Sequence, residues 1–173
     1  GDIGVTITVL DGLPHRVGLA TNTAAVEATW SPAVAASLGP WLSSTAPKVL
    51  NDGKPQVKAL RRAGVRLRGL TFDTLLAGWL MRPNFADKTL AHLVERYLGE
   101  ALPEADPSQL VPETEGATPG QLSWYALRVA EALRAEMPAD VERVLTGIEL
   151  PTLDTLADME LAGVAVSHET LAA

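Results

Sequence analysis

The chain has no cysteine among its 173 residues, and its only histidines are His15, His92 and His168. The absence of cysteine excludes disulfides and thiolate metal sites. The histidines are far apart and lack the spacing of metal ligands. No apolar run is long enough to span a membrane, and the N-terminus lacks a basic segment followed by an apolar one. These absences predict a soluble cytoplasmic domain, with a monomer as the default state.

Basic residues are also scarce. The chain has 14 Lys and Arg and 21 Asp and Glu, which gives a net charge of −7. Such acidity argues against a dedicated nucleic-acid-binding domain. Half of the basic residues nevertheless fall in one segment, and they are Lys48, Lys54, Lys58, Arg61, Arg62, Arg66 and Arg68. This segment is a candidate patch for phosphates or for an acidic neighbouring domain, with Lys54, Lys58, Arg61 and Arg62 as its main candidates. The simpler interpretation is a solvated helix face.

The residues that are present predict strands first and helices later. Three β-rich segments are expected at residues 5–10, 16–21 and 24–30, with a turn at Asp11-Gly12. A short buried strand is expected at 48–50. Helices are expected at residues 32–42, 56–63, 74–81, 89–98, 121–145 with a break near Pro138, and 149–161. The proline-rich, acidic segment 99–120 is expected to be a mobile loop. This order predicts an α/β fold with a mixed sheet flanked by helices.

Three motifs follow one another along the chain. The first is L-R-G-x-x-F-D-T-x-L at residues 67–76, and the second is T-L-x-x-L-x-x-x-Y-L-G at residues 89–99. The third covers residues 149–166. Together they resemble the 3′–5′ exonuclease domain of bacterial DNA polymerase I and its junction to the polymerase domain. The resemblance implies a ribonuclease-H-like (DnaQ-like) fold, with residues 1–148 as the exonuclease-like domain and 149–173 as the start of the junction.

The same resemblance defines where metal-binding carboxylates are expected. Active members hold two divalent ions with carboxylates, and their first motif is D-x-E on the first strand. Residues 4–13 contain a single acid, Asp11, so that pair is missing. The second motif has an Asp where this chain has Gln56, and the third motif, Y-x-x-x-D, corresponds to Tyr125 and Val129. The resemblance therefore implies that the metal ligands are absent, and that only the tyrosine is retained.

The resulting hypothesis is a vestigial exonuclease domain that serves as a scaffold within a polymerase of DNA replication and repair. The chain is then a fragment of a DNA-directed DNA polymerase, inactive by itself and expected to need no cofactor. Its partners are the remainder of the DNA polymerase I chain and, through the full-length protein, DNA and the bacterial nucleoid. Two alternatives stay open. One is an active Mg²⁺ or Mn²⁺ nuclease with a rearranged site of Asp11, Asp52 and Glu131. The other is a module that binds DNA or a partner through the Lys48–Arg68 segment.

Overall fold

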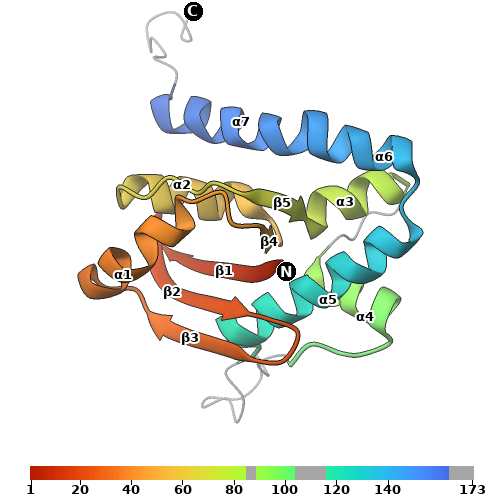
Figure 1. Cartoon of the computed structure of the whole chain (residues 1–173), viewed down its shortest axis with the longest axis horizontal. Coiled ribbons are helices and arrows are strands. Elements are labelled where there is room, and N and C mark those ends of the chain that lie inside the picture. The colour runs from red at the N-terminus through yellow and green to blue at the C-terminus, as the bar shows by residue number, and fades with distance from the viewer. Residues whose placement is uncertain (85–88, 104–115, 164–173) are drawn as a thin grey trace, which may run out of the picture.

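The computed structural model describes residues 1–84, 89–103 and 116–163, and within that part five strands form one mixed sheet (Figure 1). The strands are β1 (Ile3–Leu10), β2 (Leu13–Ala20), β3 (Ala25–Thr29), β4 (Lys48–Leu50) and β5 (Leu70–Asp73). Their order is β3-β2-β1-β4-β5. The first three strands pair antiparallel, whereas β4 and β5 extend the sheet in parallel. The predicted mixed sheet is confirmed.

The turn between β1 and β2 lies at Asp11-Gly12, where the sequence predicted it. Asp11 and Gly12 both have positive φ, 51° and 76°. Two consecutive residues with positive φ are typical of the tight hairpin turns whose twist matches that of the strands. The turn therefore fixes the register in which Leu10 faces Leu13, and a bulge between Thr8 and Val9 then shifts it so that Thr8 faces Arg16.

Helices cover both faces of the sheet, and each face has its own apolar cluster. The helices are α1 (Pro32–Leu42), α2 (Gly53–Arg62), α3 (Thr74–Met81), α4 (Leu90–Leu98), α5 (Pro119–Glu136), α6 (Ala139–Val144) and α7 (Leu150–Ala162). On one face α5 crosses the strands, and its residues pack with those of α3 and α4 around Val49 and Phe72. On the other face Val5 and Ile7 pack with α1, α2 and α7. In Figure 1, α7 lies outside α2 as an additional helical layer.

The helical segment from Ala139 to Ala162 differs from the prediction. The expected break at Pro138 is confirmed, but α6 and α7 are joined by a π-helical turn, η1 (Leu145–Glu149), rather than separated. Pro151 has no N–H, and its ring would clash with the carbonyl one turn earlier in a regular α-helix. The wider turn accommodates this residue, and the N–H of Leu150 donates to the carbonyl of Leu145 instead.

The predicted boundary after residue 148 falls inside this continuous helix. Leu153 and Ala157 of α7 belong to the same core cluster as Val5 of β1, so α7 packs on the exonuclease-like fold. The division into a domain and a junction stays a prediction. Residues 164–173 of the predicted junction lie outside the described residues.

The predicted loop 99–120 is described only at its ends, because residues 104–115 lie outside the described residues. Helix α5 begins at Pro119, two residues before the predicted start. Thr118 and Gln121 form a reciprocal capping box, and Pro119 occupies the first turn of the helix. Among residues 1–84, 89–103 and 116–163, no helix has the length and apolarity needed to cross a membrane.

Candidate functional site

A hollow of about 310 Å³ opens where the second metal motif was expected. Three parts of the fold line it: residues Thr6 to Val9 of β1, the first turn of α2 with Asp52 and Gln56, and Leu90 and Leu122 from the opposite side. Parallel pairing of β1 with β4 directs the chain from β4 into α2 beside β1. The fold therefore brings the first strand and the start of α2 together, as a two-metal nuclease site would require.

Gln56 is buried in this hollow and uses both ends of its amide. Its Oε1 accepts a hydrogen bond from the N–H of Ile7 at 2.7 Å, and its Nε2 donates to the carbonyls of Asn51 at 2.6 Å and Asp52 at 3.2 Å. The register of β1 with β4 ends at Gly4, so Gln56 continues the hydrogen bonding of that strand edge. An ionised carboxylate has no donor for the two carbonyls. The residue at the motif position is therefore built into the backbone network.

Two same-face pairs of β1 line the hollow, Thr6 with Thr8 and Ile7 with Val9. Neither pair contains a carboxylate. The Thr8 hydroxyl accepts a hydrogen bond from the N–H of Arg16 at 3.0 Å, beside the bulge in β1. These strand residues could not be singled out from the sequence, and the alternating T-I-T pattern was the only signal that they share faces.

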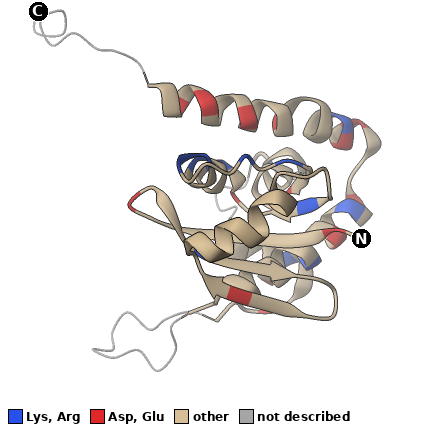
Figure 2. Cartoon of the chain, turned by 60° about the vertical axis from the view of Figure 1, so that its left-hand side comes forward, with Lys and Arg blue, Asp and Glu red and all other residues tan. Residues whose placement is uncertain are grey.

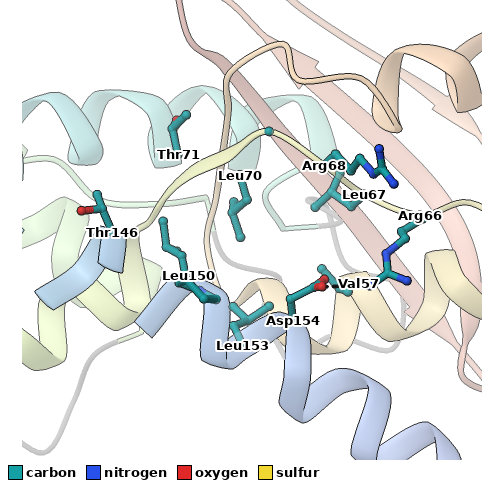
Figure 3. Close-up of a pocket in the computed structure, with 12 residues that line it drawn as sticks. Val57, Arg66, Leu67, Arg68, Leu70, Thr71, Thr146, Leu150, Leu153 and Asp154 are labelled. Carbon is teal, nitrogen blue, oxygen red and sulfur yellow. Dashed lines mark hydrogen bonds and ion pairs between the residues drawn. The ribbon is translucent and has the colours of Figure 1, made fainter. Parts of the chain in front are cut away.

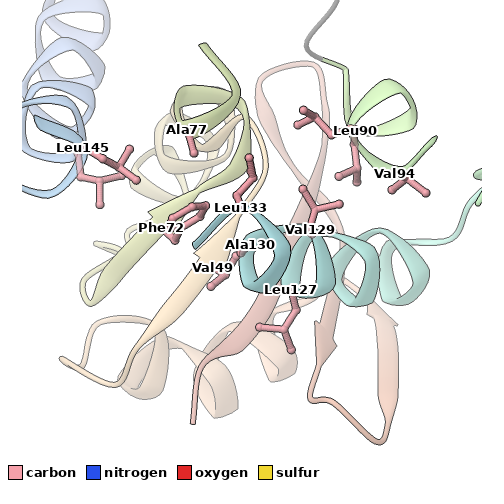
Figure 4. Packing of buried hydrophobic residues seen from close by; sticks show 13 residues of the cluster. Val49, Phe72, Ala77, Leu90, Val94, Leu127, Val129, Ala130, Leu133 and Leu145 are labelled. Carbon is pink, nitrogen blue, oxygen red and sulfur yellow. The ribbon is translucent and has the colours of Figure 1, made fainter. Parts of the chain in front are cut away.

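The third motif keeps its helical geometry on α5 but not its acid. Val129 is fully buried and packs with Leu90 and Val94 of α4 in the apolar cluster of Figure 4. Tyr125, one turn earlier, is partly buried, and burial together with Glu100 raises the pKa of its hydroxyl. At this position the chain thus has apolar packing where the family motif has a metal ligand.

Tyr125 belongs to a small polar network on the surface of α5. The guanidinium of Arg128 binds Glu100 through two hydrogen bonds, of 2.9 Å and 2.7 Å, and lies 4.5 Å from the ring centre of Trp124. The Trp124 and Tyr125 rings meet edge to face, with their centres 5.1 Å apart. The hydrogen bond from Arg128 holds the pKa of Glu100 below its usual value.

The three carboxylates of the alternative metal site lie in different parts of the fold. Asp11 is in the β1–β2 turn, Asp52 precedes α2 with a left-handed backbone (φ 51°), and Glu131 on α5 accepts a hydrogen bond from Asn22 at 3.0 Å. All three are among the described residues, and those residues contain no group of three His, Asp or Glu placed to hold a metal ion. The structure therefore does not assemble the site that the alternative required.

The candidate basic patch lies against the acidic flanks of α7 (Figure 2). Lys54 and Lys58 each place Nζ 2.7 Å from a carboxylate oxygen of Glu160. Arg61 binds both Asp154 and Asp158. The acidic partner of the basic segment is therefore a helix of the same chain.

Three other members of the basic segment differ from one another. Arg66 lies 3.1 Å from Asp154 at the rim of a hollow of about 620 Å³ between residues 66–71 and α7 (Figure 3). Arg62 donates to the carbonyl of Gly12 at 3.2 Å. Lys48 does not belong to a surface patch, because it is fully buried and its Nζ donates to two backbone carbonyls, those of Ser44 and Ala46. Burial lowers the pKa of Lys48.

Asp73 caps the start of α3, and it has a second role. One carboxylate oxygen accepts from the N–H groups of Leu75 and Leu76, at 2.9 Å and 3.1 Å. The other accepts from the N–H of Gly53 at 2.6 Å and so ties the start of α3 to the start of α2. Burial raises the pKa of Asp73 to about 6. The link to Gly53 was not predictable from the sequence, because the two residues are 20 positions apart.

Comparison with known proteins assigns this arrangement to a family. Residues 18–105 match the family model described as DNA polymerase I, ribonuclease H-like domain. DNA polymerase I of Mycobacterium bovis is 37% identical over 150 residues, which cover 80% of this chain and 17% of that protein. The chain thus spans less than a fifth of this curated relative.

Solved structures show the same fold. The POL domain of Pol1 from M. smegmatis, in complex with DNA primer-template and dNTP, matches with a TM-score of 0.81 and 28% identity, over 96% of this chain and 30% of that chain. Brucella melitensis NrnC matches with a TM-score of 0.72 and 16% identity, over 96% of this chain and 87% of that chain. The family model covers half of the residues, and the motif positions of β1 and α2 converge on one hollow. The chain therefore belongs to the ribonuclease H-like domain family of DNA polymerase I.

Proposed function

We propose that this chain is a catalytically inactive exonuclease-like domain that serves as a structural scaffold within a DNA polymerase I. The observation that carries the proposal is the position of Gln56, whose amide is engaged by Ile7 on one side and by Asn51 and Asp52 on the other. A two-metal nuclease needs several carboxylate oxygens around its ions. The hollow offers an amide at the second motif and hydroxyl or apolar side chains on β1, and Asp52 is the single carboxylate among the described residues that line it. No metal cofactor is part of the proposal.

The scaffold role also draws support from α7. This helix is held to α2 by ion pairs along both of its flanks and by apolar contacts of Leu153 and Ala157. A helix held in this way has a fixed orientation relative to the domain, and in the proposal it fixes the orientation of the polypeptide attached to it. In the proposal, the polymerase activity and the contact with DNA belong to the full-length protein, which acts as a monomer in the bacterial cytoplasm at the nucleoid.

Titration of Mn²⁺ into the purified chain, together with digestion of a 3′-labelled single strand, tests the loss of catalysis. We expect neither a stoichiometric metal site nor metal-dependent shortening of the strand. A metal-dependent nuclease in the same buffer serves as the positive control. Digestion that requires Mn²⁺ and disappears in an Asp52→Asn variant would overturn the proposal, because it would show a catalytic site rebuilt around that residue.

A binding module based on the basic segment has less support. Lys54, Lys58 and Arg61 already bind the carboxylates of α7, and a phosphate would have to displace those partners. Fluorescence anisotropy with a labelled single strand tests this alternative, because phosphate contacts weaken steeply with added salt. We expect no salt-dependent binding by the unaltered chain.

A further inference from the structure

The hollow of about 620 Å³ beside β5 is a groove that follows the main chain. Six consecutive residues, 66–71, line one of its walls (Figure 3). Successive side chains of a non-helical segment point in different directions. An unbroken run of lining residues, which includes Gly69, therefore shows that the hollow runs along the backbone itself. Its volume lies within the range of about 300–1,000 Å³ that is typical of ligand sites.

The wall of this groove includes an open edge of the sheet. Strand β5 is the last in the strand order, and no further strand pairs with it in the part of the chain that the structure describes. The carbonyl of Gly69 accepts from the N–H of Lys48 at 2.8 Å, so Gly69 faces β4. Main-chain groups of successive strand residues alternate between the two edges. Those of Leu70 therefore point away from β4, toward the groove that this residue lines.

The opposite wall of the groove is apolar and helical. It is formed by Leu150, Pro151 and Leu153 of α7, with Val57 of α2 below them. Main-chain groups inside a helix are already bonded within it, so this wall offers side-chain packing rather than hydrogen bonds. Strand addition to a sheet edge uses such a division, because main-chain bonds to the edge give affinity and pockets for side chains give specificity.

The charge at one end of the groove favours an acidic partner. Arg66 and Arg68 lie together at that end (Figure 3). Arg68 is exposed, and its guanidinium has no hydrogen bond or ion pair with another described residue. Arg66 shares Asp154 and Asp158 with Arg61. Three guanidiniums thus meet two carboxylates, which leaves one positive charge without a partner.

We propose that this groove binds an acidic peptide segment of a partner protein, which adds as a strand to the outer edge of β5 and places a carboxylate beside Arg68. The inference goes beyond the scaffold function and does not depend on the loss of catalysis. A free main-chain edge requires an extended peptide, and an arginine without a partner favours a carboxylate. At the other edge of the sheet, β3 carries Glu27 and no basic residue. Charge therefore directs the peptide to β5.

Fluorescence anisotropy with a labelled peptide of about six alternating glutamate and valine residues tests the strand addition. Alternation places the acids on one face of the strand and the apolar side chains on the other. We expect saturable binding that weakens with added salt. N-methylation of alternate residues keeps the charge and removes the N–H groups of one peptide edge. One of the two methylation registers should bind at least about tenfold more weakly, because it loses the bonds to β5. Unchanged affinity in both registers, or no saturable binding up to about 1 mM peptide, would overturn the proposal.

A matched pair of variants tests the role of Arg68. Arg68→Ala removes an exposed arginine that lines the groove, whereas Arg62→Ala removes an exposed arginine of α2 that does not line it. Both variants change the net charge by the same amount. We expect Arg68→Ala to weaken peptide binding about fivefold and Arg62→Ala to change it less than about twofold. Equal effects would show that only overall charge matters and would contradict the assignment.

Amide hydrogen exchange, followed by NMR, locates the added strand. The peptide should slow the exchange of the Leu70 N–H and leave that of Val26 on β3 unchanged, because an amide that enters a ladder exchanges only when the ladder opens. Protection of Val26 instead of Leu70 would place the peptide at the other edge of the sheet and overturn the proposal.

Two further titrations identify other occupants of the groove. Loss of peptide binding in full-length DNA polymerase I containing this chain would show that the polymerase polypeptide itself fills the groove. Peptide affinity that falls as the concentration of the chain rises would identify a second copy. Either result would overturn the proposal. None of these measurements reads out nuclease activity, so their failure is distinguishable from failure of the proposed loss of catalysis.

Discussion

Replacing Gln56 by glutamate tests whether its amide is a structural cross-link. The change preserves the length of the side chain, and one carboxylate oxygen still accepts from the N–H of Ile7. The other oxygen replaces the Nε2 donor that lies 2.6 Å from the Asn51 carbonyl and 3.2 Å from that of Asp52. Two carbonyls thus lose their donor, and an acceptor with negative charge faces them. Gln56→Glu is therefore expected to destabilise the fold although it restores an acid near a family metal position.

The magnitude follows from the groups involved. A buried polar group without its partner costs about 1–3 kcal/mol, and burial of an ionised carboxylate adds to that cost. We expect the free energy of unfolding to fall by about 2–4 kcal/mol at pH 8. In the unfolded chain a glutamate titrates at about 4.3, and burial raises its pKa in the folded state. The penalty is therefore smallest at low pH, where a neutral carboxyl donates to Asn51, and it grows as the pH rises through the folded-state pKa.

Urea unfolding between pH 5 and pH 8, followed by circular dichroism, measures this dependence. Gln56→Met is the matched control, because it has a similar length and removes all three hydrogen bonds without adding a titrating group. The loss of stability in Gln56→Met should be independent of pH, and the loss in Gln56→Glu should increase with pH. Parallel losses in the two variants, or an unchanged stability of Gln56→Glu at pH 8, would refute the cross-link.

Two further predictions concern the helix contacts. The side chain of Arg61 is only 9% exposed, and its removal leaves Asp154 and Asp158 with the exposed Arg66 as their remaining partner. Arg61→Ala should lower the free energy of unfolding by about 1–2 kcal/mol, because it loses both packing and ion pairs. Arg62→Ala is the control; it loses one exposed hydrogen bond to Gly12 and should lower the free energy of unfolding by about 0.5 kcal/mol or less. Urea titrations measure both variants, and equal losses of stability would contradict the contact between Arg61 and α7. Asp73 should titrate near its folded-state pKa of about 6 in carboxyl ¹³C NMR. Because that value lies above the ordinary one of about 3.9, its contribution to stability is greatest below pH 4 and declines as the pH rises through 6; a midpoint below 4 would show that its three N–H donors outweigh burial.

The strands and most helix starts could be predicted because their signals are local. Asp11-Gly12 requires positive φ at two positions, and Asp73 precedes a run of apolar residues that needs a cap. The π-helical turn could not be predicted, because the sequence around Pro151 reads equally well as a helix start. In the structure the helix continues through Pro151, and Leu153 and Ala157 beyond it pack in the same cluster as residues of α2.

The positions of the motif residues could be predicted from the sequence, but the contacts of their side chains could not. Motif spacing identified Gln56 and Val129, and the structure places Gln56 in the hollow and Val129 in the neighbouring apolar cluster. The directions of the basic side chains could not be predicted, because charge in a sequence has no direction. Lys48 points into the protein, and the partners of Lys54 and Lys58 lie about a hundred residues away on α7.

The π-helical turn η1 also determines which side of α7 faces the rest of the fold. It needs about one residue more than a regular turn to complete a full rotation, so the residues beyond it lie about 100° away from the positions they would have in an uninterrupted α-helix of the same sequence. In an uninterrupted α-helix of the same sequence, Leu153 and Ala157 would turn away from α2, and the flanking acids would move out of reach of Arg61. The side of α7 that packs on the domain therefore depends on the five residues of η1, which precede the helix.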